Sequence, residues 1–242
     1  MSLIAADVAI GYPGRAPLAS GLSLSVEPGE RLALLAPSGF GKSTLCRVLS
    51  GFMAPMRGEV RVDGLRIPEP GCRAVQLLWQ HPEQAFDPRL RMRRSLAEAG
   101  GLEGDRWDLL SERFGLSAAW LSRFPAELSG GELMRCCIVR ALMVSPRYLI
   151  ADEATAMLDA VTQAQLVRAL IDTQEEEGMG MIFVSHSPSL VRRVATRSVD
   201  LQQFAPDPSR AKLKRGFERT AIYLGNPQGA HKIGIPERKV LH

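Results

Sequence analysis

The chain has 242 residues, of which 45% are hydrophobic and 23% are charged, as in an ordinary globular protein with one main unit and a subdomain. Its net charge of +4 comes from the end of the chain, because residues 205–242 hold eight Lys or Arg and three Asp or Glu. That leaves 22 basic and 23 acidic residues in 1–204. The body is therefore neutral and the tail basic, so no nucleic-acid partner is expected.

No apolar stretch approaches the roughly 20 residues needed to cross a bilayer. The longest, within 141–151, is interrupted by Ser145, Pro146 and Arg147. The N-terminus lacks a basic segment followed by an apolar core, so we expect a cytoplasmic protein. The four cysteines form no Cys-x-x-Cys pair, and we expect them to be small buried hydrophobes: Cys46, Cys72, Cys136 and Cys137.

Seven short apolar or β-branched runs predict strands. Three of them are almost purely apolar, which is typical of a parallel sheet covered by helices on both faces. In Leu22–Val26, serines alternate with apolar residues, which indicates a half-exposed antiparallel strand. The predicted strands are Ile4–Tyr12, Leu22–Val26, Arg31–Leu35, Glu59–Val62, Ala74–Trp79, Tyr148–Ala151 and Met181–Val184.

Helical patterns follow the strands at Lys42–Ser50, Glu132–Val144, Ala160–Glu176 and Ser189–Ala195. No convincing strand lies between Pro82 and Val144, so we expect a helical subdomain inserted at about 82–146. The predicted fold is α/β, with an antiparallel β subdomain near the N-terminus. One domain would span 1–204, and the Pro- and Gly-containing tail, 205–242, would be loosely ordered.

The clearest local signal is a glycine-containing loop between an apolar strand and a helix, the context of a phosphate-binding P-loop. Its backbone N–H groups, at a helix N-terminus, would wrap phosphates. Lys42 would add positive charge, and Ser43 would offer its hydroxyl to Mg²⁺. The strict pattern has glycine at the first position, and if that residue needs positive φ an alanine costs about 1 kcal/mol. The loop reads Ala36-Pro37-Ser38-Gly39-Phe40-Gly41-Lys42-Ser43-Thr44.

Two acids end the apolar strand at Tyr148–Ala151. Asp152 would reach the Mg²⁺ shell, and Glu153 would act as general base on an attacking water. Alone, such acids are more often helix caps or solvated charges. Because they follow a P-loop by about a hundred residues, they predict a nucleotide site.

A second phosphate cradle is predicted at Leu128-Ser129-Gly130-Gly131-Glu132, which opens a helix. Two cradles in one chain are explained if each serves a different nucleotide. Here the sequence resembles the ATP-binding cassette (ABC) ATPases, whose signature motif matches residues 128–132. The resemblance covers roughly residues 3–201, with the motifs in family order. It implies a RecA-like P-loop core, ATP and Mg²⁺ as cofactors, and hydrolysis between two copies or paralogues.

The resemblance also implies roles for single residues. Tyr12 matches the aromatic that stacks on adenine, and Gln80 the glutamine that joins Mg²⁺ and the attacking water to the helical subdomain. His186 matches the switch histidine at the γ-phosphate. Asp159 lies in the loop that touches the opposite subunit, where Ala156 replaces a small hydroxyl residue. The full set is catalytic Glu153, His186, Lys42 and Gln80; nucleotide-binding Tyr12, Ser38, Gly39, Phe40, Gly41, Lys42, Ser43, Thr44, Ser129, Gly130, Gly131 and Asp159; and metal-binding Ser43, Gln80 and Asp152.

The run from Gln80 to Arg89 resembles the peptide/nickel branch of bacterial importers, which implies integral membrane permease subunits as partners on the cytoplasmic face of the inner membrane. Phe86, Leu90 and Met92 would either form a groove for a permease helix or pack the helical subdomain. A DNA-repair ATPase needs a coiled-coil arm for which the segment between Gln80 and Ser129 is too short. A soluble cassette serving cluster assembly or translation remains the alternative.

Overall fold

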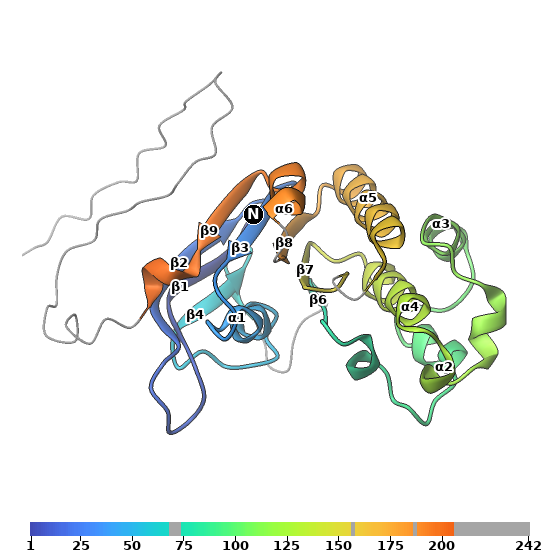
Figure 1. Cartoon of the computed structure of the whole chain (residues 1–242), viewed down its shortest axis with the longest axis horizontal. Helices are drawn as coiled ribbons and strands as arrows, with labels where there is room; N and C mark the ends of the chain where they lie inside the picture. Colours follow the sequence, from blue (N-terminus) through green and yellow to red (C-terminus); the bar gives the residue numbers. More distant parts are fainter. Residues whose placement is uncertain (68–73, 156–157, 186–187, 206–242) are drawn as a thin grey trace, which may run out of the picture.

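The computed structural model describes residues 1–67, 74–155, 158–185 and 188–205. Its strands are β1 (Leu3–Ile10), β2 (Ala19–Val26), β3 (Arg31–Leu35), β4 (Arg57–Val62), β5 (Leu65–Arg66), β6 (Val75–Leu78), β7 (Tyr148–Asp152), β8 (Gly180–Val184) and β9 (Arg197–Asp200). They form an antiparallel sheet in the order β2-β1-β4-β5 and a parallel sheet in the order β6-β7-β8-β3-β9 (Figure 1). The predicted combination of parallel and antiparallel sheets is confirmed.

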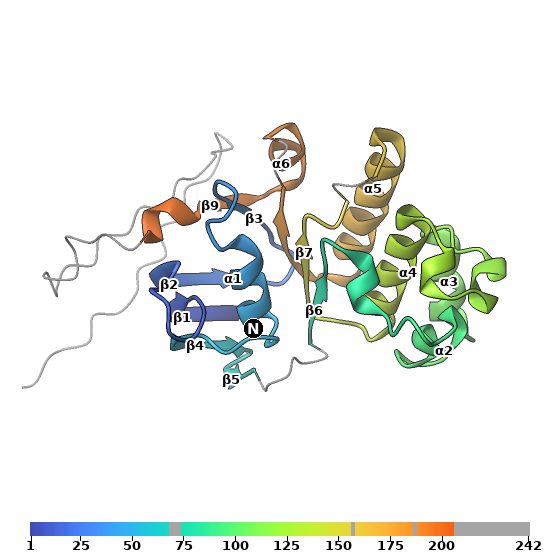
Figure 2. The ribbon, with the colours of Figure 1, turned by 60° about the horizontal axis from the view of Figure 1, so that its bottom comes forward.

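Helices fill the interval between β6 and β7. The α-helices are α1 (Lys42–Leu49), α2 (Met92–Ala97), α3 (Asp105–Arg113), α4 (Gly130–Met143), α5 (Ala160–Glu177) and α6 (Pro188–Val194), with short 3₁₀ turns at Pro82–Ala85, Ala118–Ser122, Pro125–Glu127 and Leu201–Phe204. Helices α2, α3 and α4 gather at one end of the molecule, opposite β1 and β2 (Figure 2). The predicted helical insertion is therefore present.

The parallel sheet is buried on both faces, as its apolar strands predict. Along β3, Leu32 and Leu34 pack into a core shared with α1 and the antiparallel sheet. Between them, Ala33 points to the other face and packs with Phe183 and with Val191 of α6. A third apolar cluster joins α4 and α5 to β7 and β8. One face of the sheet thus supports α1, and the other supports α4, α5 and α6.

The strand predictions differ from the structure at the margins. The first strand ends at Ile10, so Tyr12 lies in the following loop. Strand β9 lacks the apolar pattern that predicts a strand, because it lies at the edge of the sheet, where three of its four residues are polar and none is fully buried. Strand β5 is two exposed residues long and has no apolar pattern.

Burial settles two further expectations. Cys46, Cys136 and Cys137 are buried and free, as predicted, whereas Cys72 lies outside the described residues. Phe86 and Met92 are buried in the helical cluster, so for these two residues the packing alternative is correct and the exposed-groove alternative is wrong, whereas Leu90 is only partly buried. None of the described helices combines the length and apolarity needed to span a membrane. Residues 206–242 of the predicted tail lie outside the described part of the chain.

A bulge in β1 explains a required glycine in β4. The register of β1 with β4 shifts between Ala6 and Ala9, and Asp7 has a φ of 49°. Gly58 crosses this bulge with a φ of 80°, and a Cβ there would meet the carbonyl oxygens of Ala6 and Asp7. The close approach of two backbones leaves no room for a side chain.

We therefore expect Gly58→Ala to lower the free energy of unfolding by about 2–4 kcal/mol, from the left-handed backbone and from overpacking together. Gly29→Ala is the matched control. Gly29 has a φ of 76° and open space around its Cβ position, so only the backbone term of about 1 kcal/mol applies. Urea unfolding of both variants measures the difference, and equal losses would contradict the role of the bulge.

Candidate functional site

The predicted phosphate loop joins β3 to α1, and two of its glycines adopt left-handed conformations. Gly39 has a φ of 77°, and Gly41, the residue before α1, has a φ of 92°. Lys42 is buried, and its Nζ donates to the carbonyl oxygens of Ala36 at 2.9 Å and Pro37 at 3.1 Å. The loop therefore wraps around its own lysine, which keeps the positive charge at the cradle.

Ala36 is not strained. It is absent from the residues with positive φ, and its side chain packs against the main core. The conditional cost of alanine at this position does not apply, because the backbone there never enters the left-handed region. Alanine instead adds a small apolar contact beneath the loop.

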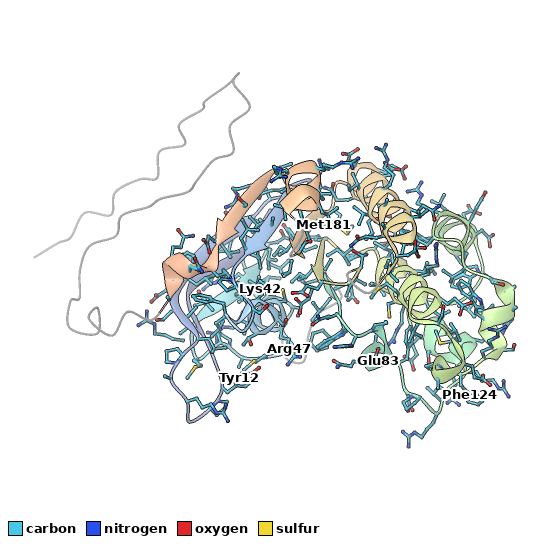
Figure 3. All side chains as sticks on the ribbon, viewed as in Figure 1. Tyr12, Lys42, Arg47, Glu83, Phe124 and Met181 are labelled. Carbon is cyan, nitrogen blue, oxygen red and sulfur yellow. The ribbon has the colours of Figure 1, made fainter. Side chains whose placement is uncertain are left out.

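The remaining predicted loop residues divide into exposed and packed ones. Ser38 is exposed, whereas Phe40 packs against the main core and Thr44 is buried. Tyr12 is 43% exposed, and its hydroxyl lies 3.4 Å from Thr44 Oγ1. In Figure 3, Tyr12 and Lys42 lie on the same half of the molecule. An exposed aromatic ring thus stands beside the start of α1.

Asp152 is a buried carboxylate at the carboxyl end of β7, 6% exposed. Burial raises its pKa, and the Glu153 charge raises it further. The Ser43 hydroxyl, Arg47 and Lys42 act in the opposite direction. Among the described residues, Asp152 Oδ1 is buried without a hydrogen-bond partner. A buried carboxylate oxygen with an unused lone pair, next to a serine hydroxyl, fits an oxygen-liganded cation such as Mg²⁺.

Glu153 adopts a left-handed backbone conformation, with a φ of 52°. For a residue with a long side chain this costs of order 1–3 kcal/mol and is typical of functional sites. Its N–H donates to Val184 O at 3.3 Å, and its Oε2 accepts from Gln80 Nε2 at 3.1 Å. The structure therefore joins the predicted base to the predicted glutamine at the end of β6.

The turn after Glu153 carries residues that the sequence did not single out. Gln163 Nε2 donates to both the carbonyl and the hydroxyl oxygen of Thr155, at 3.1 and 3.2 Å. A cavity of about 350 Å³ opens beside this turn, between α5, α6 and β8. The spacing of Thr155 and Gln163 in the sequence does not predict that they belong to the site, because their hydrogen bonds depend on where α5 lies in the fold.

Arg47 and Trp79 were also missed. The Arg47 guanidinium carbon lies 5.4 Å from the centre of the Trp79 ring, and Phe52 contacts the same ring edge-on at 5.3 Å. Arg47 also opposes the raised pKa of Asp152. In the sequence Arg47 has the pattern of a solvent-facing helix residue, so only the fold reveals this contact.

The second predicted cradle lies away from the first. Ser129 caps α4: its Oγ accepts from Glu132 N at 3.3 Å, while Glu132 Oε2 accepts from Ser129 N at 2.7 Å. This backbone hydrogen bond is the main reason that the pKa of Glu132 is lowered. Ser129 and Gly130 are exposed, and Gly131 is partly exposed. Helices α1 and α4 stand on opposite halves of the molecule (Figure 1), so the structure does not bring the two cradles together.

Asp159 is an exposed helix cap. Its Oδ1 accepts from the backbone N–H groups of Val161 and Thr162, each at 3.0 Å, at the start of α5. The Thr162 side chain is the largest cause of the lowered pKa of Asp159, and the backbone N–H of Thr162 is the next. His186 and Ala156, which also match family positions, lie outside the described residues.

Comparison with known proteins gives close matches. A family model described as "ABC transporter" matches residues 19–156. A putative peptide import ATP-binding protein of Brucella abortus (strain 2308) is 37% identical over 193 residues, 73% of this chain and 58% of that protein. The glutathione import ATP-binding protein GsiA of Salmonella typhimurium is 36% identical over 191 residues, 73% of this chain and 31% of that protein. The chain therefore spans less than two thirds of the length of these relatives.

Solved structures agree on the fold. A structure of an ATP-binding subunit of an ABC transporter has a TM-score of 0.72 and 27% identity, over 83% of this chain and 86% of that one. The ATP-binding cassette MJ0796, bound to ADP and Pi, also has a TM-score of 0.72, with 24% identity over 82% and 94% of the two chains.

The family match covers more than half of the chain, including the phosphate loop, Gln80, residues 128–132 and the Asp152-Glu153 pair. The solved structures share its α/β architecture with a P-loop core. The chain belongs to the ABC transporter family.

Proposed function

We propose that the chain binds and hydrolyses ATP as the nucleotide-binding subunit of an ABC importer. The observation that carries this proposal is the 3.1 Å contact between Gln80 and Glu153, two residues 73 positions apart that meet beside the phosphate loop. A positioned carboxylate next to a phosphate cradle is what activation of an attacking water requires.

Nucleotide binding is assigned to the loop and its neighbour Tyr12. The backbone N–H groups of residues 38–44, Lys42 and the N-terminal end of α1 would hold the phosphates. The half-exposed Tyr12 ring would stack on the adenine. His186 is proposed to contact the γ-phosphate, on the strength of the family motif alone.

Mg²⁺ would be held by Ser43, Gln80 and Asp152. The orphaned Oδ1 of Asp152 supports this set, and a cation there would offset the burial that raises the pKa of this carboxyl. When bound, Mg²⁺ would neutralise charge on the phosphate oxygens. Within the protein, Glu153 would accept the water's proton and Gln80 would hold the Glu153 side chain in place.

A complete site would need two cassettes. The Ser129–Gly131 cradle is exposed and lies on the other half of the molecule from the phosphate loop, so it is available to a nucleotide held by a second copy or a paralogue. Asp159, at the start of α5, would contribute to the same contact between subunits. The proposed assembly is therefore an ATP-dependent dimer.

Import is favoured over the soluble alternative by the relatives, which are named as peptide and glutathione import proteins. On this basis the partners are integral membrane permease subunits, and the protein is peripheral on the cytoplasmic face of the inner membrane. A peptide-like cargo fits these names better than nickel. Recovery of a permease by purification of the chain from membranes tests the assignment.

We predict that Glu153→Gln keeps ATP binding but lowers turnover by two to four orders of magnitude, because the amide has the shape of the acid and cannot accept a proton. The variant should then accumulate as an MgATP-dependent dimer. Phosphate release and size-exclusion chromatography, with and without MgATP and with a candidate paralogue, measure both effects.

The control adds Ser129→Arg to the Glu153→Gln chain. A bulky cation at the exposed cradle should prevent dimer formation while leaving nucleotide binding to the phosphate loop intact. Normal hydrolysis by Glu153→Gln would remove Glu153 from the mechanism, and a dimer that persists with Ser129→Arg would contradict the shared site.

The phosphate loop should tolerate Ala36→Gly. Because Ala36 is unstrained, the affinity for ATP should change less than tenfold, which corresponds to about 1.4 kcal/mol. Loss of the methyl contact and added backbone freedom should lower the free energy of unfolding by about 1 kcal/mol. Titration with a fluorescent ATP analogue and thermal unfolding check both values; a hundredfold gain in affinity would show that alanine distorts the cradle.

A further inference from the structure

Three consecutive glutamates end helix α5. Glu175, Glu176 and Glu177 lie in its last turn, where the helix dipole is negative and acidic side chains are unfavourable. Each of the three pairs with an arginine from another element. These arginines offset the unfavourable position of the three carboxylates, and through them the last turn of α5 contacts β3 and α3, which are distant from it in sequence.

The first of these contacts reaches the strand that leads into the phosphate loop. Arg31, the first residue of β3, donates from Nη1 to Glu175 Oε1 at 2.8 Å and to Gln174 Oε1 at 2.8 Å. Gln174 is fully buried, and its Nε2 donates to Met179 O at 2.6 Å. Arg31 is thus fixed by both a charged and a buried neutral partner.

The other two contacts reach α3. Arg113 binds Glu176 through two nitrogens, at 2.6 and 3.0 Å, and donates to the buried Thr173 hydroxyl at 3.0 Å. Arg106 pairs with Glu177 at 3.0 Å and donates from Nε to Leu142 O at 3.2 Å, in the last turn of α4. Helix α4 begins beside Ser129, so these contacts connect α5 to the helix that carries the second cradle.

Ion pairs at the end of α5 can fix how α3 and α4 are oriented on α5 and the sheet, because apolar packing alone determines this orientation only loosely. The helices and the sheet share a continuous apolar cluster, which favours contact but is not directional. A bidentate arginine–carboxylate pair has a defined geometry. The arginine side chains are 18–32% exposed, whereas Glu175 and Glu176 are more than half exposed and Glu177 is 25% exposed. Water therefore screens the first two pairs in part, and their geometry comes mainly from the additional hydrogen bonds of Arg31 and Arg113 to the buried Gln174 and Thr173.

We infer that Glu175, Glu176 and Glu177 form a clamp that sets the orientation of the Ser129 cradle relative to the phosphate loop. Arg31, Arg106 and Arg113 are positioning residues, since their contacts are with α5, α4 and their neighbours and they would act through β3, α3 and α4. The consequence for turnover rests on the proposed function, whereas the clamp itself is a property of the chain without nucleotide.

The test is a charge swap across one pair. Arg113→Glu and Glu176→Arg should each lower kcat about fivefold at saturating MgATP, while the affinity of the monomer for a fluorescent ATP analogue changes less than twofold. The double swap should return kcat to within about threefold of the unmodified chain. Arg113→Lys, which keeps the charge but loses the bidentate geometry, should fall between the two.

The matched control is the Arg168–Asp172 pair at 2.9 Å, which joins two residues one turn apart in α5 and, within the described part of the chain, has no ion pair to another element. Arg168→Glu and Asp172→Arg should leave kcat unchanged. Hydrogen exchange without nucleotide provides a readout independent of hydrolysis: amides of α3 and the start of α4 should exchange faster in Arg113→Glu and recover in the swap.

The results of hydrogen exchange and of ATP hydrolysis test the clamp and the proposed function separately. Faster exchange with no ATP hydrolysis even in the unmodified chain would support the clamp and overturn the proposed function. Unchanged exchange in Arg113→Glu, or a double swap no better than the single variants, would overturn the clamp. An equal fall in kcat for the Arg168 control would show a general charge effect and overturn it too.

Discussion

The structure depends on holding opposite charges close together at the buried end of a parallel sheet. Lys42 and Asp152 are both only 6% exposed, and each would be costly to bury alone. Lys42 donates two of its three N–H groups to loop carbonyls, whereas Asp152 has one oxygen without a hydrogen-bond partner among the described residues. The site therefore keeps one lysine N–H for a phosphate oxygen and one carboxylate oxygen for a cation, which is the pairing that the proposed nucleotide with Mg²⁺ would supply.

The sheet order accounts for this meeting of charges. Strand β8 lies between β3 and β7, so the phosphate loop after β3 and the acids after β7 emerge at the same edge, one strand apart. Gln80 arrives from β6, on the far side of β7, and its 3.1 Å contact closes the group around Glu153. In parallel sheets, ligands bind at the carboxyl ends of the strands, and here four strands supply or support the site.

Much of the fold and of the candidate site could be predicted from the sequence, because these parts depend on local sequence patterns. The phosphate loop, the acids ending β7 and the start of a helix at residues 128–132 each depend on neighbours within a few residues. The polar edge strand β9, the contact of Gln163 with Thr155 and the packing of Phe86 and Met92 inward depend on tertiary placement, which spacing does not encode. The condition for strain at Ala36, a positive φ, is not met, whereas Glu153 at the site does have a positive φ, because φ is set by the turn and not by the motif.

The left-handed conformation of Glu153 is maintained by its neighbours in the fold. Glu153 is held in a left-handed conformation by three restraints: its N–H bonds to Val184, its carboxylate bonds to Gln80, and the turn that follows is tied to α5 through Gln163. A conformation that costs energy persists only where its surroundings determine it fully. Two of the restraints come from β8 and α5, in the core, and the third comes from Gln80, at the entrance to the helical insertion. The orientation of Glu153 is therefore set jointly by β6, β8 and the start of α5, and not by the phosphate loop alone.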